Sequence, residues 1–237
     1  MTQSTYSDTD DALVSSIGNA FEAWVEFESY IFRRIDQDKS IARLSLLNVG
    51  AGRLVTGAEL PFFKSFRDCY LAEPDDARRQ QLSTNLFGLP AKILSERIEE
   101  LSPNTHECVD FVLCKYVLQH IETGKLDECF LNLKSMVKPG GRIDLFTSFS
   151  SEADDFYQLI IADDDVNEVP AQLRQTLAGG HKIAEDVFND LLSRTQKFSF
   201  IATHHFSINS LRKYFQGWRV SIVFGPYDVA YLEAAAP

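Results

Sequence analysis

A short apolar run that ends in two closely spaced glycines is the segment best suited to binding a small molecule. Residues 46–52 read LLNVGAG, so a β-strand is expected to run into a tight turn at Gly50 and Gly52. Glycine lacks a Cβ, so a ligand can approach this backbone closely, and the N–H groups of a following helix would point at it. Glu73 ends the next expected strand, 21 residues after Gly52. That spacing is near the ~20 residues that separate a glycine turn from the acid that binds a ribose diol.

The residues after the two glycines favour a cofactor without phosphate groups. A dinucleotide-binding turn uses a third glycine for close helix packing, whereas Leu54 and Val55 occupy that region here. Beyond Arg53, this loop offers no basic partner for a phosphate. The pattern therefore predicts a ligand with ribose and adenine but no pyrophosphate, and S-adenosyl-L-methionine is such a molecule.

Alternating apolar runs and helical patterns predict the α/β elements that must position these residues. The spacing of apolar residues predicts one long helix or two over 10–37. A second amphipathic helix is expected over 126–141, where Pro139-Gly140-Gly141 ends it. The expected strands cover residues 43–50, 67–75, 91–96, 108–116 and 142–149. Strands that alternate with helices indicate βαβ units and a parallel sheet.

The second half of the chain departs from this alternation. Residues 151–200 are rich in helix formers and are interpreted as an inserted helical cap. A helix is then expected over 206–216, followed by two strands joined at Gly225-Pro226 as an antiparallel hairpin. The expected segments are a tail and helical cap (1–40), a cofactor-binding core (41–150), a helical lid insertion (151–200) and the end of the core with its hairpin (201–237).

Composition and charge narrow the class of protein. The chain has 237 residues, 45% of them hydrophobic, which is enough for one α/β domain with a large core. Its formal charge of -11 disfavours nucleic acid and anionic membranes as partners. The N-terminus is polar and acidic, and no apolar run reaches the ~20 residues that span a bilayer. The four cysteines lack metal-binding spacing, so we expect reduced thiols, no metal and a cytoplasmic location.

Six stretches of the chain together resemble the class I S-adenosylmethionine-dependent methyltransferases. They are LLNVGAGR, YLAEPD, KILSERIEEL, VDFVLCKYVLQHI, MVKPGGRIDLF and HHFSINSLRKYF with the GWRV that follows it. The resemblance implies a three-layer Rossmann-like fold with a seven-stranded, mostly parallel sheet and a reversed C-terminal hairpin. It also implies S-adenosyl-L-methionine as the cofactor and S-adenosyl-L-homocysteine as its product.

The same resemblance implies which side chains contact the cofactor. In the family, an acid after the third strand contacts adenine, and Glu96 matches that position best. The family also has an acid two residues before the first glycine, where this chain has Asn48. Asn48 can form hydrogen bonds but supplies no charge to the α-ammonium of the cofactor. The residues expected at the cofactor are Asn48, Gly50, Ala51, Gly52, Glu73, Pro74, Glu96, Arg97, Cys114 and Lys115.

The reaction centre is expected just after the fourth strand, because ligands of parallel sheets bind beyond the carboxyl ends of the strands. His120 is the first candidate for a general base, since a histidine pKa lies near the operating pH. Tyr116 could stack on a substrate. Both residues could instead serve packing alone, and His204 and His205 could reach the same cleft. The cap residues Phe156, Tyr157 and Phe188 are candidates for apolar walls, although such residues are more often part of a core.

Three functions remain open from the sequence. The first is O- or N-methylation of a small organic molecule, as in specialised biosynthesis. The second is a methyltransferase-like protein that binds the cofactor but catalyses another reaction, such as a cyclisation. The third is a non-catalytic binding or regulatory partner, in which Trp24 and Phe27 of the N-terminal helix form a dimer surface. A homodimer is an option in each case.

Overall fold

The computed structural model describes residues 19–52, 59–86, 88–161, 182–194 and 200–237. The first part of the expected N-terminal helix, the loop residues Arg53, Leu54 and Val55, and the Gly179-Gly180 pair lie outside the described residues. In the part of the chain that is described, no helix is long and apolar enough to cross a bilayer.

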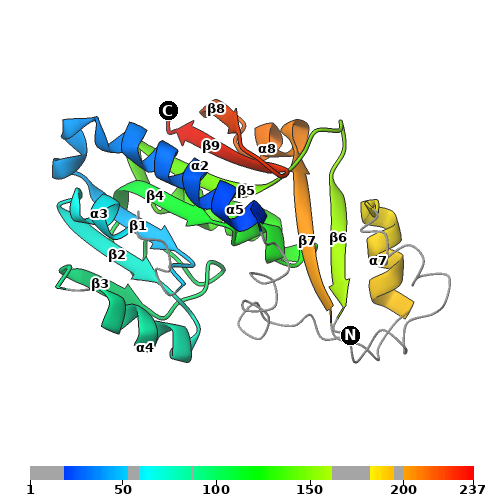
Figure 1. The fold of residues 1–237 in the computed structure, drawn as a ribbon, viewed down its shortest axis with the longest axis horizontal. Coiled ribbons are helices and arrows are strands. Elements are labelled where there is room, and N and C mark those ends of the chain that lie inside the picture. The colour runs from blue at the N-terminus through cyan, green and yellow to red at the C-terminus, as the bar shows by residue number, and fades with distance from the viewer. Residues whose placement is uncertain (1–18, 53–58, 87, 162–181, 195–199) are drawn as a thin grey trace.

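Five parallel strands form the centre of the fold, in the spatial order β3-β2-β1-β4-β5 (Figure 1). Their bounds are β1 (Ser45–Val49), β2 (Asp68–Ala72), β3 (Ala91–Leu94), β4 (Val109–Lys115) and β5 (Val137–Ser150). Because β1 pairs in parallel with both β2 and β4, the turns that follow these three strands emerge at one edge of the sheet. The predicted parallel sheet is therefore confirmed, and it brings the glycine turn, Glu73 and Lys115 to the same edge.

The chain ends in the predicted antiparallel hairpin. Strands β8 (Arg219–Phe224) and β9 (Val229–Ala235) pair with each other, and β9 also pairs antiparallel with β5. Gly225 donates its N–H to the carbonyl oxygen of Val229 at 2.8 Å, which closes the hairpin. The order β3-β2-β1-β4-β5-β9-β8 is the seven-stranded arrangement that the sequence predicted.

Two further strands extend the sheet where a purely helical insertion was expected. Strand β6 (Phe156–Ile161) pairs antiparallel with β7 (Phe200–Ser207). The last residues of β5 leave β9 and pair in parallel with β7, through Phe149 with Phe206 and Ser150 with Ser207. Within the described part of residues 151–200, only α7 (Glu185–Arg194) is an α-helix. The expectation of a helical cap was wrong for β6, where a run of aromatic and β-branched residues favours a strand.

Helices cover both faces of the central sheet. Besides α7, the described helices are α2 (Asn19–Asp36), α3 (Glu59–Lys64), α4 (Asp76–Asn85), α5 (Leu126–Ser135) and α8 (Ile208–Tyr214), with the short 3₁₀ turns η2 (Lys39–Arg43), η3 (Leu118–His120) and η4 (Thr123–Lys125). Ile31 of α2 and Phe63 of α3 pack on one face, where Leu46 lies. Phe130 of α5 packs on the other face, with Leu47. This makes the three layers that the sequence predicted, with α2 lying across the sheet (Figure 1).

Helix α5 is shorter than expected. It ends at Ser135, and the Pro139-Gly140-Gly141 turn belongs to the start of β5 rather than to the helix end. A Cβ on Gly141 would lie 2.6 Å from the carbonyl oxygen of Asp110, so β4 approaches this turn too closely for a side chain. Gly141 therefore permits the close pairing of β4 and β5, and the expectation that this turn ends the helix was wrong.

All four cysteines are free thiols, as expected. Cys69 is buried on the α2 face of the sheet, and Cys114 and Cys129 are buried on the α5 face. Burial raises the pKa of each of these three thiols to about 12. Cys108 is half-buried.

Candidate active site

The glycine turn after β1 bends back over the end of β2. Gly50 and Gly52 adopt positive φ angles of 69° and 61°, which other residues rarely adopt. The N–H groups of Gly50 and Ala51 both donate to the carbonyl oxygen of Ala72, at 2.9 and 3.0 Å. A Cβ on Gly50 would lie 2.2 Å from a methyl group of Val117, so the turn is also pressed against the segment after β4. The sequence motif thus forms the tight, side-chain-free turn that a close ligand requires.

Glu73 lies directly against this turn. Its side chain is buried, one carboxylate oxygen accepts the Gly52 N–H at 2.8 Å, and the other accepts the Asp75 N–H at 3.0 Å. These bonds fix the carboxylate at the end of β2, and Asp75 in turn caps α4. The 21-residue spacing was the sequence signal for this pair, and the structure brings the two residues into contact.

Asn48 occupies the middle of β1 with its side chain on the face that α2 and α3 cover. It is only 1% exposed, and neither atom of its amide has a hydrogen-bond partner among the described residues. A buried polar group without a partner costs roughly 1–3 kcal/mol. An amide in this position is suited to a polar ligand beside the glycine turn.

Lys115 forms a buried ion cluster at the end of β4. Its Nζ lies 2.6 Å from Oε2 of Glu28 on α2 and 2.7 Å from Oε1 of Glu59, the first residue of α3. Burial lowers the pKa of Lys115, but Glu59 and Glu28 raise it by more, so its net pKa lies above the ordinary value. The ammonium therefore stays charged and ties both helices to the end of the strand.

The two carboxylates of this cluster are the site residues that sequence reasoning missed. Glu28 precedes Ile31, Phe32 and Ile35 at helical spacing, so it interrupts the apolar stripe of α2. An acid within an apolar stripe is a usable signal for a buried charge. Glu59 follows the glycine loop with no comparable pattern, and only the fold brings it to Lys115.

Cys114 and Tyr116 flank Lys115, but their side chains lie in different surroundings. Cys114 is 1% exposed and points into the α5 face, so its side chain does not lie beside Asn48 and Lys115, and any cofactor contact falls to its backbone. Tyr116 has a positive φ of 54°. Its ring stacks on Trp24 of α2, with ring centroids 5.8 Å apart.

Trp24 and its neighbour Phe27 are partly buried and contact aromatic side chains at the sheet. Trp24 lies on Tyr116, and Phe27 lies edge-on to Phe146 with ring centroids 6.1 Å apart. Helix α2 thus uses both side chains to cover its own sheet, and the dimer surface considered from the sequence stays a prediction.

His120 lies in η3, between the end of β4 and strand β7. The structure has a single 3₁₀ turn there, from Leu118 to His120. The ring is partly exposed, with Nδ1 3.1 Å from the carbonyl oxygen of Ala202 and Nε2 3.2 Å from the Gln119 amide nitrogen. Burial lowers the pKa of His120 to about 4, although the bond to the Ala202 carbonyl group opposes this shift, so the imidazole is neutral at pH 7. With Nδ1 donating to the carbonyl group, Nε2 accepts the Gln119 N–H, and it can act as a base once a substrate hydroxyl replaces that donor.

His204 is part of a buried hydrogen-bond chain in the β6-β7 ribbon. Its Nε2 lies 2.8 Å from Oδ2 of Asp155, and its Nδ1 lies 3.3 Å from the Tyr157 hydroxyl, which reaches Thr123 at 3.2 Å. Burial opposes ionisation of Asp155, but bonds from His204 and Ser207 outweigh it and lower the Asp155 pKa to about 2. These side chains hold the β6-β7 ribbon together, with His204 and Tyr157 buried in it.

The other residues suggested for the lid also pack within it. His205 stacks on Phe156 and lies 3.0 Å from the side-chain oxygen of Gln158, and burial lowers its pKa to about 4. Tyr157 stacks on Phe188 of α7 with centroids 4.3 Å apart. Phe156, Tyr157 and Phe188 are buried, so they are core residues of the insertion rather than exposed apolar walls.

Glu96, Arg97 and Pro74 lie near the ends of β2 and β3. Glu96 is partly exposed, and its Oε1 lies 3.0 Å from Nε2 of His106. The Arg97 N–H donates to a carboxylate oxygen of Glu100, while the Arg97 side chain is exposed. Pro74 is exposed directly after Glu73. The structure thus brings Glu96 and Glu73 to the same edge, with Glu96 held by a histidine that the sequence did not single out.

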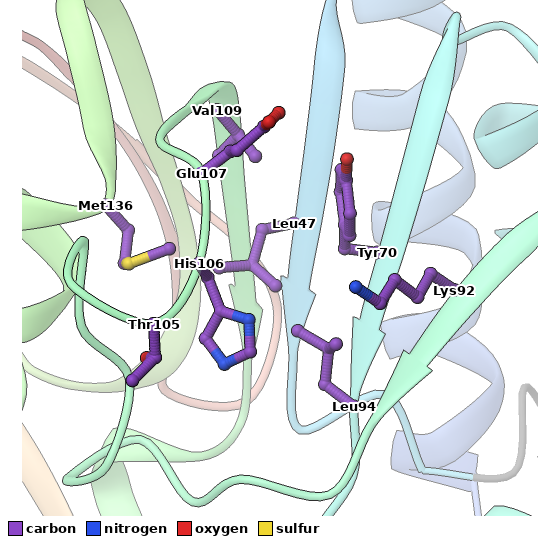
Figure 2. A pocket seen from close by; sticks show the side chains of 9 residues that line it. All are labelled: Leu47, Tyr70, Lys92, Leu94, Thr105, His106, Glu107, Val109 and Met136. Atoms are coloured by element: carbon purple, nitrogen blue, oxygen red, sulfur yellow. The ribbon is translucent and has the colours of Figure 1, made fainter.

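A cavity of about 220 Å³ opens below Glu96, on the α5 face of the sheet. Its lining is Leu47, Tyr70, Lys92, Leu94, Thr105, His106, Glu107, Val109 and Met136 (Figure 2). Figure 2 shows the His106 ring and the Lys92 amine beside this space, with the side chains of Leu47 and Leu94 near them. Leu47 and Val109 belong to the core beneath α5, so this cavity is separate from the site of Asn48 and Lys115.

Metal ligands do not gather anywhere in the described part of the chain, where no group of three or more His, Cys, Asp or Glu side chains could hold an ion. The groups at this edge of the sheet are a buried carboxylate, a glycine turn, a buried amide, an ion cluster and a neutral imidazole.

Comparison with known proteins identifies the fold. The family model described as a methyltransferase domain matches residues 47–144, from β1 to β5. This span contains the glycine turn, Glu73 and His120. No curated protein matches the sequence significantly.

Solved structures of methyltransferases share this architecture over nearly the whole chain. A DhpI–SAH complex superposes with a TM-score of 0.61 and 13% identity, covering 98% of this chain and 91% of that one. Magnesium protoporphyrin IX methyltransferase from Synechocystis PCC 6803, with bound SAH, superposes with a TM-score of 0.59 and 12% identity. The match covers 100% of this chain and 90% of that one. The 1,6-didemethyltoxoflavin-N1-methyltransferase of Burkholderia thailandensis superposes with a TM-score of 0.57 and 12% identity. The match covers 100% of this chain and 92% of that one. The chain thus has the Rossmann-like fold of the class I methyltransferases, and the expected resemblance is confirmed.

Proposed function

We propose that this protein is an S-adenosylmethionine-dependent methyltransferase that methylates oxygen or nitrogen of a small organic molecule. The observation that carries the proposal is the Gly52–Glu73 contact at 2.8 Å, which holds a carboxylate at the turn after β1. A carboxylate at that point can accept from both hydroxyls of a ribose. The contact lies inside the segment that matches the methyltransferase domain.

The residues present fit this cofactor. Gly50 and Gly52 leave the turn without side chains, and the unpartnered amide of Asn48 lies one pleat below it. Glu96 stands at the same edge as Glu73, where an adenine contact is expected. The bound cofactor would supply a methyl group on a positively charged sulfur.

Positioning is the main task of such an enzyme, because methyl transfer is an in-line displacement. Correct alignment of two reactants can lower the barrier by roughly 7 kcal/mol or more. Tyr116, fixed by its stacking on Trp24, would define one wall of the acceptor site. His120 would take the proton of a hydroxyl acceptor through Nε2, since Nδ1 is held by Ala202.

A small acceptor is favoured by the charge of the chain and by its structural relatives. The formal charge of -11 opposes a long phosphate surface. The structures with the same fold include enzymes named for toxoflavin and porphyrin precursors and for glycopeptides.

A second candidate function is cofactor binding without methyl transfer, in a different reaction or a regulatory role. Asn48 favours it, because a neutral amide replaces the acid that the family has at this position. The two candidates share the cofactor site and differ in the fate of the methyl group.

Calorimetric titration with S-adenosylmethionine and S-adenosylhomocysteine tests the cofactor site. We expect both to bind the wild-type chain and Glu73→Ala to lose most of that affinity, because the ribose loses its carboxylate. Glu107→Ala, which changes an exposed acid away from the turn, is the matched control and should bind normally. No heat with the wild-type protein would reject the cofactor assignment, and unchanged affinity in Glu73→Ala would remove Glu73 from the site.

The fate of the methyl group separates the two functions. The protein is incubated with methyl-labelled S-adenosylmethionine and a cell extract filtered to retain small molecules only. Label that moves into a small molecule supports methyl transfer, whereas tight cofactor binding with no transfer to any fraction favours the second candidate.

A further inference from the structure

The ion cluster at the end of β4 contains one more acid than base. Glu28 and Glu59 both contact Lys115, at 2.6 and 2.7 Å, and each glutamate is only 4% exposed. Two carboxylates and one ammonium leave a formal charge of -1. Uncompensated charge is costly to bury. The cluster ties β4 to both α2 and α3, but it leaves one carboxylate charge without a counterion at Lys115, and a cationic ligand would balance that charge.

The cluster lies beside the glycine turn. Asn48 pairs with Leu113 in the register of β1 and β4, so Lys115, two residues further on, stands level with Gly50. Asn48, Leu113 and Lys115 share the α2 face of the sheet because side chains alternate along a strand. Glu59 begins α3 on the far side of the loop that starts at Gly52.

Asn48 is a second, independent sign of a ligand at this point. Its amide is 1% exposed and has no partner among the described residues. It lies on the same face as the cluster, one pleat below Lys115. A ligand with both hydrogen-bond donors and a positive charge would satisfy the amide oxygen and the excess carboxylate together.

The cofactor of the proposed function carries such a group, since its amino-acid end has an α-ammonium and an α-carboxylate. We propose that Glu28 and Glu59, spaced by Lys115, bind the α-ammonium of this amino-acid end, with Asn48 as a neutral hydrogen-bonding partner. This assignment rests on the proposed function and adds helix α2 to the cofactor site. It makes the N-terminal helix a charged cover over the amino-acid end.

Paired ligands with and without the amino-acid end test the assignment. The full chain is titrated with S-adenosylhomocysteine and with 5′-methylthioadenosine, which keeps the adenosine and the sulfur but lacks the amino-acid portion. We expect Glu28→Gln and Glu59→Gln each to lower the affinity for S-adenosylhomocysteine by about tenfold or more, because each change removes a charge-assisted hydrogen bond. Methylthioadenosine affinity should stay within about twofold of the wild-type value.

Two comparisons guard against a merely structural effect. Glu26→Gln makes the same change at an exposed position of α2 and should alter neither affinity. Asn48→Asp returns a negative charge beside the turn and should recover part of the S-adenosylhomocysteine affinity that Glu28→Gln loses. Loss of structural packing alone would weaken both ligands and would not be rescued by a charge at position 48.

Binding by the wild-type chain also decides the case without any variant that could fail to fold. The analogue of S-adenosylhomocysteine that lacks only the α-amino group should bind about tenfold more weakly or worse. Equal binding of this analogue, or equal losses for both ligands in the glutamine variants, would overturn the assignment while leaving the proposed function intact. A wild-type chain that binds neither ligand would reject the proposed function itself, and the ammonium site with it.

Discussion

His120 is the residue on which the chemistry of the acceptor depends most directly. Its Nδ1 is held by the Ala202 carbonyl group, and its pKa is lowered to about 4. A base of this strength is neutral throughout the physiological range, but it accepts a proton only weakly. It can therefore assist a phenol or an acidic N–H better than an aliphatic alcohol.

We expect His120→Asn to lower kcat by about 100-fold or more for a hydroxyl acceptor, the usual contribution of a general base. Affinity for S-adenosylhomocysteine should not change, because the cofactor contacts lie at other residues. For the wild-type enzyme, lowering the pH should reduce the rate only near pH 4, where the imidazole becomes protonated. A variant with wild-type kcat would assign His120 to packing between η3 and β7.

Single residues were predictable where the signal was local. Glu73 was identified because a fixed spacing links it to Gly52, and both residues end neighbouring strands. Cys114 was named with Lys115, yet the alternation of β4 sends the two side chains to opposite faces. Glu59 was missed because its partner Lys115 is far away along the chain, and no local pattern announces a long-range ion pair.

At the scale of elements, the turn after β1 is the most constrained segment. Gly50 combines a positive φ with a 2.2 Å approach of a would-be Cβ to Val117. Gly52 has a similar φ but no described neighbour within 4 Å of such a Cβ. An alanine at Gly52 would therefore suffer backbone strain alone, whereas an alanine at Gly50 would also clash with Val117.

We expect Gly50→Ala to destabilise the protein more than Gly52→Ala. The left-handed conformation alone costs an alanine about 1–2 kcal/mol. Gly50→Ala must also displace Val117, which raises the total to about 2–4 kcal/mol, as for an overpacked core. Urea denaturation measures both values. Val117→Ala in the Gly50→Ala background should recover the steric part, and equal effects of the two glycine changes would show that Val117 yields freely.

Helices and strands were predictable where their pattern of apolar residues was uniform over enough residues. The strands of the parallel sheet and the C-terminal hairpin follow from apolar runs closed by glycine or proline. Strand β6 was misread because six residues are too few to separate a buried strand from a helix by periodicity. Its pairing with β7 is set by tertiary contacts that the sequence does not display.

At the scale of the molecule, strand β5 joins the two parts of the sheet. Its first residues pair with β4 and β9, and its last two residues pair with β7. The whole-chain architecture was predicted through the family resemblance, whereas the added ribbon was not. The ribbon lies beside η3, so the fold places a separately built element next to the expected reaction centre.

The buried thiols also offer a way to measure how often the folded protein opens, because a reagent reaches them only in the open state. Cys69 lies under α2, Cys114 lies under α5, and Cys129 is on the buried side of α5, each with a pKa raised to about 12. At pH 8 almost none of these groups is a thiolate, so a thiol reagent must wait for the fold to open.

We expect mass spectrometry to detect one rapid modification, at the half-buried Cys108, and three slow ones. Cys108→Ser should remove the rapid phase alone. A bound cofactor should slow the other three in proportion to its affinity, since ligands that bind only the folded state suppress opening. Rapid modification of a second thiol would contradict the burial described here. The modification rate of the buried thiols would then report how much cofactor is bound, even while the methyl acceptor is unknown.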